Sequence, residues 1–111
     1  MNYIKKYFPL SKSEYENSFK EMNNEFRYVS KSEISYVKKM FDKLYLAAKS
    51  GSDPAHGTLK YDEREDLEET LKDIESDINE YEEYSCKGWV TIENTICDIF
   101  GWGSGRAEYW G

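Results

Sequence analysis

The sequence is poor in the residues that most often build catalytic or metal sites. Its 111 residues include one histidine and two cysteines, Cys86 and Cys97, whose spacing matches neither a CxxC nor a zinc-finger pattern. Two cysteines and one histidine cannot supply the four ligands of an ordinary zinc site. His56 lies in an expected loop, and the sequence places no nucleophile or acid beside it. We therefore expect a protein that is not an enzyme, binds no cofactor or metal, and keeps its cysteines as free thiols.

Long hydrophobic runs are also missing. No stretch approaches the about 18–20 consecutive apolar residues that a membrane-spanning helix needs. Residues 1–6 contain no apolar run typical of a signal peptide. We therefore expect a cytoplasmic protein with no membrane partner. Proline occurs only twice, so long uninterrupted helices are allowed.

What the sequence has in excess is negative charge, concentrated in one segment. Residues 62–83 contain twelve acidic and two basic residues and therefore carry −10. Residues 1–61 carry +4 and residues 84–111 carry −1, which accounts for the net charge of −7. Because contacts to phosphates need clustered Lys and Arg, this composition argues against direct binding of nucleic acid.

Two helix starts have almost the same sequence. Residues 10–15 and 29–34 each place a serine at the N-cap, a glutamate three residues later, and apolar residues on both sides. This pattern is typical of a capping box with a hydrophobic staple, in which side chains satisfy backbone N–H groups at the helix start. Apolar residues at helical spacing follow each start. The first stripe is Tyr15, Phe19, Met22 and Phe26, and the second is Ile34, Val37, Phe41, Leu44 and Ala48.

Two further helices are expected in the second half of the chain. After a loop that begins near Gly51, the acidic segment predicts an amphipathic helix starting near Asp62. Its apolar positions fall within about 40° of one line and are Leu67, Leu71, Ile74, Ile78 and Tyr81. A last helix should run from about Gly88 to Phe100 and end at Gly101.

These elements predict a mainly all-α fold with a single domain over residues 1–111. The simplest architecture is a small four-helix bundle-like domain in which each helix buries one apolar face. A short extended N-terminal arm precedes it, and an aromatic, glycine-rich C-terminal tail follows it.

The carboxylates of the third helix are the candidate binding site. The predicted residues are Asp62, Glu65, Asp66, Glu69, Asp73, Asp77, Glu80 and Glu83. Carboxylates four positions apart are separated by about 6 Å along a helix axis, which is comparable with the spacing of phosphates on a DNA strand. We expect no neighbouring residues to neutralise them, and the flank Glu68, Glu75 and Glu82 adds further charge. Such a helix can occupy a basic groove meant for nucleic acid; the alternative is a merely solvated outer face.

The aromatic residues of the tail are further candidate contacts. Trp102, Tyr109 and Trp110 lie on a glycine-rich backbone and could anchor a partner, or they could fold back onto the base of the bundle. The stripe that begins at Tyr15 is expected in the core; if exposed, it would be a dimer interface.

The hypothesis that follows is an acidic, non-enzymatic inhibitor that masks the basic surface of a nucleic-acid-binding protein, such as a nuclease or an effector complex. Small size, high Lys, Glu, Asn, Tyr and Ile usage and the lack of a catalytic motif would suit a phage or mobile-element product acting in the cytoplasm of its host. DNA-mimicking anti-CRISPR and anti-restriction proteins and acidic nuclease-immunity proteins share this general character, although the chain matches no motif of these families.

Two alternatives stay open at this point. One is a helical homodimer or larger homo-oligomer with a structural or scaffold role, whose acidic face only meets solvent. The other is a small regulatory subunit that places a helix in a partner's groove. Charge reversal at Glu69, Asp73 and Glu80 separates these hypotheses. The inhibitor should lose binding while keeping its fold, whereas the scaffold should change little or become slightly more stable.

Overall fold

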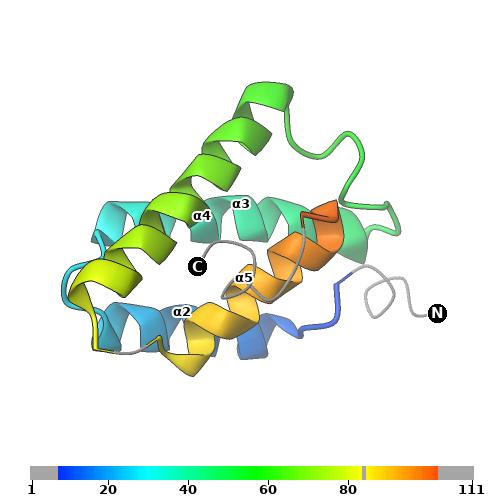
Figure 1. Cartoon of the computed structure of the whole chain (residues 1–111). Helices are drawn as coiled ribbons and strands as arrows, with labels where there is room; N and C mark the ends of the chain where they lie inside the picture. Colours follow the sequence, from blue (N-terminus) through cyan, green and yellow to red (C-terminus); the bar gives the residue numbers. More distant parts are fainter. Residues whose placement is uncertain (1–7, 84, 103–111) are drawn as a thin grey trace.

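The computed structural model describes residues 8–83 and 85–102, and over these residues the chain forms four α-helices and no strand (Figure 1). The helices are α2 (Lys12–Glu25), α3 (Lys31–Lys49), α4 (Tyr61–Tyr81) and α5 (Lys87–Phe100). The predicted all-α fold class is confirmed. The main packed pairs are α2 with α5, α3 with α4, and α2 with α3. Residues 1–7 of the predicted arm and residues 103–111 of the tail lie outside the described residues.

The two predicted serine caps are present. The Ser11 hydroxyl accepts a hydrogen bond from the Glu14 N–H (3.2 Å), and the Glu14 carboxylate accepts one from the Ser11 N–H (2.8 Å), which completes a capping box at the start of α2. The Ser30 hydroxyl caps α3 by accepting from the N–H groups of Ser32 and Glu33. Both helices therefore start where the sequence places them.

The start of α4 differs slightly from the expectation, whereas the helix ends agree with it. Asp62 lies inside the first turn, because the Glu63 carboxylate folds back and accepts the Lys60 N–H at 3.0 Å, which makes Lys60 the N-cap. Gly51 follows α3 with φ of 93°, and Gly101 ends α5 with φ of 70°. Both glycines adopt the left-handed backbone conformation that other residues rarely take.

The apolar stripes of the four helices meet in one core. The first stripe is at most 3% exposed, so it is part of the core and not a dimer surface. The ring of Phe41 lies 4.8 Å from those of Phe8 and Tyr15. Tyr81 is the exception to the predicted stripe of α4, since its side chain is 55% exposed. It is the last residue of α4, and its ring lies at the surface, 6.1 Å from the ring of Tyr28.

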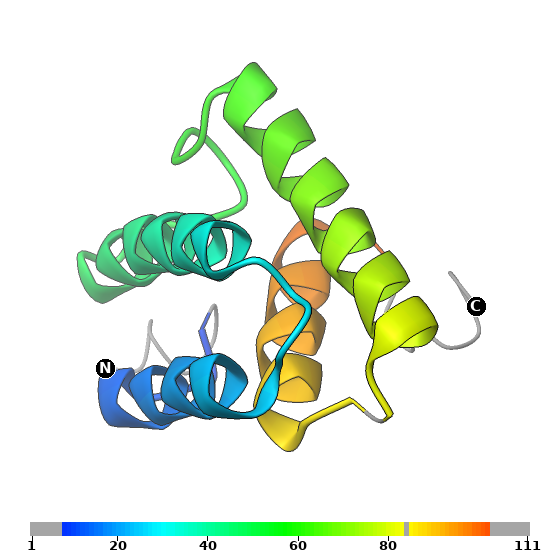
Figure 2. The same ribbon diagram turned by 90° about the vertical axis from the view of Figure 1, so that its left-hand side faces the viewer.

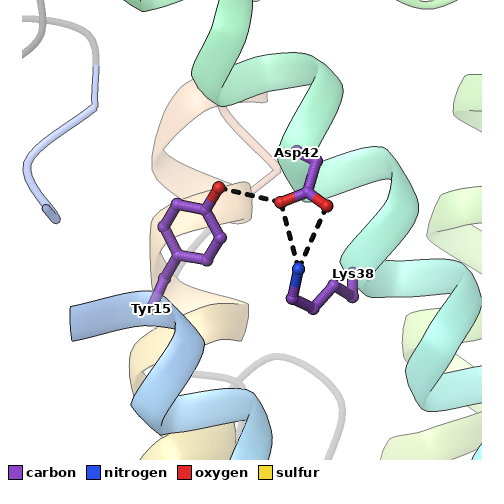
Figure 3. A network of polar contacts seen from close by, with 3 residues as sticks. All are labelled: Tyr15, Lys38 and Asp42. Atoms are coloured by element: carbon purple, nitrogen blue, oxygen red, sulfur yellow. Dashed lines mark hydrogen bonds and ion pairs between the residues drawn. The ribbon is translucent and has the colours of Figure 1, made fainter. Parts of the chain in front are cut away.

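One polar network joins α2 to α3 (Figure 3). The Tyr15 hydroxyl donates a hydrogen bond of 2.8 Å to Asp42 Oδ1. Lys38 Nζ donates to both carboxylate oxygens of Asp42 (3.3 and 3.1 Å) and lies 5.8 Å from the centre of the Tyr15 ring. Burial, and then the bond to Asp42, raise the pKa of Tyr15, so the phenol stays a donor well above neutral pH.

A glycine allows α5 to lie directly against α2. A Cβ added at Gly88 would lie 2.5 Å from the carbonyl oxygen of Ser18 and 2.8 Å from Glu21 Oε1. Because real Cβ atoms do not come so close to other atoms, any side chain here would push the helices apart. Gly88 therefore fixes the distance between two helices that are far apart in the sequence.

Candidate functional site: the outer face of helix α4

Helix α4 lies at the edge of the helical assembly, with one side turned away from the other helices (Figure 2). Its inner side buries Leu67, Leu71, Ile74 and Ile78. The predicted carboxylates lie elsewhere on its surface and just past its end. Those exposed are Asp62, Glu65, Asp66, Glu69, Asp73, Glu80 and Glu83, and Asp77 is half-buried. At 1.5 Å per residue, the 21 residues of α4 span about 30 Å.

The described part of the chain supplies few cations that pair with α4. In residues 8–83 and 85–102, a single salt bridge reaches this helix, from Lys43 Nζ of α3 to Glu63 Oε2 at 2.7 Å. The bond to Lys43, followed by the bond to the Lys60 N–H, lowers the pKa of Glu63. The expectation that nothing neutralises the helix is therefore wrong for its first turn. None of the eight predicted carboxylates forms an ion pair with a described cation.

Helix α3 adds a further carboxylate beside α4. The pKa of Glu33 is raised by burial and then by the charges of Asp77 and Asp73. The pKa of Asp77 is raised by burial and then by Asp73 and Glu80. Like charges thus repel across the α3–α4 boundary as well as along α4. Sequence reasoning assigned Glu33 to a capping box and missed this second role, because the role depends on how the two helices pack.

Two of the three flanking glutamates are not simply solvated, which corrects the expectation for Glu75 and Glu82. Glu75 is 5% exposed, and its Oε1 accepts a hydrogen bond of 2.9 Å from the indole N–H of Trp89 in α5. Glu82 Oε2 accepts from the backbone N–H groups of Arg27 (3.0 Å) and Tyr28 (2.7 Å). These carboxylates satisfy donors that the packing of the helices brings to this flank, so both have structural roles.

The only tail aromatic that the structure describes is Trp102, which packs against the helices. Its half-buried ring stacks on that of Phe100 with 4.8 Å between centroids, and the guanidinium carbon of Arg64 lies 4.7 Å from the Phe100 centroid. Trp102 also lines a hollow of about 260 Å³ together with Tyr61, Arg64, Glu65 and Glu68. It therefore lies beside the first half of the acidic helix. Tyr109 and Trp110 lie outside the described residues.

The other residues considered for metal binding or nucleophilic chemistry are His56, Cys86 and Cys97. Over the described part of the chain, no group of three or more His, Cys, Asp or Glu residues could hold a metal ion. His56 is exposed and has Asp53 Oδ2 at 3.7 Å. Cys86 and Cys97 are free and buried, and burial, followed by the charge of Glu93, raises the pKa of the Cys97 thiol to about 12. Such a thiol is a poor nucleophile at neutral pH.

Comparison of this chain with protein-family models, with curated proteins and with solved structures finds no significant match. Among the four described helices, none combines the length and the apolar character that a membrane span requires.

Proposed function

We propose that this protein is a non-enzymatic, acidic inhibitor that masks the basic surface of a nucleic-acid-binding protein. The observation that supports it is the outer face of α4, where six predicted carboxylates are exposed and a seventh, Glu83, follows the end of the helix. The only salt bridge from α4 to a described cation involves Glu63 in the first turn. A surface of this length and charge is complementary to a basic groove that normally holds a phosphate backbone. In the finer form of the proposal, the protein is a DNA mimic of the anti-CRISPR, anti-restriction or nuclease-immunity type and acts in the cytoplasm.

Electrostatics and packing have separate roles in this mechanism. The field of the acidic face steers the basic partner and speeds the encounter. Binding of partner cations between Glu33, Asp73 and Asp77 relieves the repulsion that raises the pKa values of Glu33 and Asp77 in the free protein. Trp102, beside the first half of α4, supplies an aromatic contact that lengthens the lifetime of the complex.

The alternative of a homo-oligomeric scaffold required an exposed aromatic stripe. Tyr15, Phe19, Met22 and Phe26 are instead buried within the fold, so this stripe is not available to a second copy. A solvated acidic face without a partner remains the competing interpretation, and the following experiment separates the two.

The test is a pull-down from nuclease-treated host lysate, eluted in steps of increasing salt and analysed by mass spectrometry. We expect one nucleic-acid-binding protein that releases as the salt concentration rises, because salt screens contacts between exposed charges. The double variant Glu69→Lys/Asp73→Lys should retain this protein at least about tenfold less well, as expected for the loss of two charge contacts.

The matched control is Glu16→Lys/Asp98→Lys, which changes the net charge equally at exposed residues of α2 and α5. It should bind the partner like the wild type. Equal loss in both variants would show that only net charge matters, and recovery of nothing but the protein itself would refute the proposed function.

A further inference from the structure

A second surface lies where the ends of α2 and α4 meet. It is a hollow of about 510 Å³ between the α2–α3 connection and the residues that follow α4. Among the described residues it is lined by Glu25, Arg27, Tyr28, Tyr81, Glu82 and Glu83. None of the predicted site residues except Glu83 contributes to it, so the hollow is distinct from the row of carboxylates along α4.

Two exposed aromatic rings form one wall of this hollow. Tyr28 is 63% exposed and Tyr81 is 55% exposed, and their rings are tilted by 48° at 6.1 Å between centroids. Glu82 holds the Tyr28 backbone in place, because its Oε2 accepts the N–H groups of Arg27 and Tyr28. The rings are therefore presented to solvent by an ordered backbone, although neither contributes to the core.

The charges around the two rings favour a cation. The carboxylates of Glu82 and Glu83 line the hollow together with one guanidinium, that of Arg27. Arg27 forms no salt bridge within residues 8–83 and 85–102, so it does not neutralise any of these carboxylates by direct contact. Glu82 Oε1 accepts no hydrogen bond from the described residues and is free to accept one from a ligand.

The end of α4 strengthens this preference. The C-terminal end of a helix carries partial negative charge from unpaired carbonyl groups, and cations are stabilised there. At the end of α2 the cation is Lys31, whose ammonium group donates a hydrogen bond to the carbonyl oxygen of Asn23. The last turn of α4 contains no basic residue. The end of α4 therefore lacks, within its last turn, a basic residue that does what Lys31 does at the end of α2.

We propose that this hollow receives an arginine side chain of the basic protein partner, with the guanidinium stacked on Tyr28 or Tyr81 and hydrogen-bonded to both oxygens of Glu83 or to Oε1 of Glu82. Planar guanidinium groups stack on aromatic rings and bind carboxylates through two parallel bonds, which a lysine ammonium cannot do. The chain already uses the same contact internally, where Arg64 lies over the ring of Phe100. The identity of the partner in this inference rests on the proposed function. The preference of the hollow for a guanidinium group does not.

The test uses N-acetyl-arginine amide as the probe and the ring signals of Tyr28 and Tyr81 in NMR spectra as the readout. Its neutral analogue N-acetyl-citrulline amide, at matched ionic strength, is the control ligand. We expect saturable shifts of both ring signals with the arginine probe and none with citrulline. Tyr28→Ala and Tyr81→Ala should each weaken binding of the probe about tenfold, as expected for the loss of one stacked cation contact.

Three control variants keep the result interpretable. Tyr28→Phe retains the ring and should bind the probe like the wild type. Tyr61→Ala removes a tyrosine that is 76% exposed at the other end of α4 and should also have no effect. Glu69→Lys/Asp73→Lys lies outside the hollow and should leave probe binding within a factor of about two, as expected for screened charges at a distance.

Failure of this inference is distinguishable from failure of the proposed function. Absence of saturable shifts, or equal shifts with citrulline, overturns the arginine site whatever the pull-down recovers. Saturable shifts that Tyr28→Ala and Tyr81→Ala weaken support the site. If the arginine probe binds while Glu69→Lys/Asp73→Lys still retains its partner normally, the arginine site stands and the masking role of α4 does not.

Discussion

Tyr15 shows how one hydroxyl can tie two helices together within an aromatic core. Its hydrogen bond to Asp42 crosses from α2 to α3 and involves a charged acceptor. We expect Tyr15→Phe to lower the free energy of unfolding by about 1–2 kcal/mol, because a hydrogen bond to a charged group usually contributes about 1.5–3 kcal/mol and this one is only partly buried. Urea unfolding at neutral pH measures this difference.

The control for this variant is Tyr45→Phe. Tyr45 also packs against the core, and its hydroxyl forms no hydrogen bond with the described residues. The free energy of unfolding of Tyr45→Phe should fall by less than about 0.5 kcal/mol, as is usual for residues outside buried hydrogen-bond networks. The raised pKa of Tyr15 gives a second check. The folded state keeps the proton where the unfolded phenol has lost it, so wild-type stability should fall above about pH 10, and less so in Tyr15→Phe.

Single residues are also where sequence reasoning was weakest. Glu75 and Glu82 share a helical flank with Glu68, and nothing in their spacing separates a solvated carboxylate from a structural one. The difference comes from the indole of Trp89 and the backbone of Tyr28, which reach this flank only after the helices pack. A buried N–H must find an acceptor, and which glutamate supplies it is decided by tertiary geometry.

At the scale of elements, the approach of α5 to α2 depends on Gly88. We expect Gly88→Ala to destabilise the protein by about 1–3 kcal/mol, the cost of overpacking a close contact, because the new Cβ would meet the Ser18 carbonyl oxygen at 2.5 Å. Thermal unfolding followed by circular dichroism measures the effect. Lys87→Ala, at the exposed preceding residue, should change the midpoint little; an unchanged midpoint in Gly88→Ala would show that the helices can separate without cost.

The contact between α3 and α4 carries an electrostatic cost at Glu33. We expect Glu33→Gln to stabilise the protein by about 0.5 kcal/mol at pH 7, since two like-charge contacts are removed and glutamine can still serve the helix cap. The pKa of Glu33 is raised above its ordinary 4.5, so the cost is present when the group is ionised and disappears below the unfolded value.

Urea unfolding of Glu33→Gln at several pH values tests both parts of this prediction. The gain over wild type should be largest near neutral pH and vanish below about pH 4, where the unfolded glutamate is also protonated. Glu16→Gln, at an exposed residue of α2, is the control and should show no such pH-dependent gain. A destabilised Glu33→Gln would mean that its capping bond outweighs the repulsion from Asp73 and Asp77.

The elements themselves were predictable for local reasons. Serine caps with glutamate three residues later, stripes at helical spacing, and glycines at helix ends act within a few residues, so they can be read without the fold. The interhelical contacts of Gly88 and Glu33 could not be predicted in this way. Tyr81 fits the helical period of the buried positions in α4, but it is the last residue of the helix. A periodic pattern does not show how far the neighbouring helices extend, so it could not predict that Tyr81 is exposed.

At the scale of the whole molecule, the uneven charge makes stability depend on salt in an unusual direction. Raising NaCl from about 10 mM to about 150 mM shortens the Debye length from about 30 Å to about 8 Å. Because repulsion on α4 outweighs its single salt bridge to a described cation, we expect the thermal midpoint to rise by about 3 °C. A protein held together by surface ion pairs would respond in the opposite direction.

The Glu69→Lys/Asp73→Lys variant tests the origin of this salt effect. Two of the repelling charges are reversed, so its midpoint at low salt should exceed that of the wild type, and salt should raise it less. An identical salt response in both proteins would show that the repulsion responsible for the salt effect lies outside α4. This outcome would not affect the pull-down, which measures binding and not stability.

The burial of both cysteines has a practical consequence for following such a complex. A thiol-reactive dye needs an accessible thiolate. Burial raises the pKa of Cys97 to about 12 and also raises the pKa of Cys86. A new cysteine at the exposed Lys72 or Asn79 of α4 should therefore take up a fluorophore alone, with the native cysteines left in place. The arrival and departure of a partner at the acidic helix could then be watched one molecule at a time.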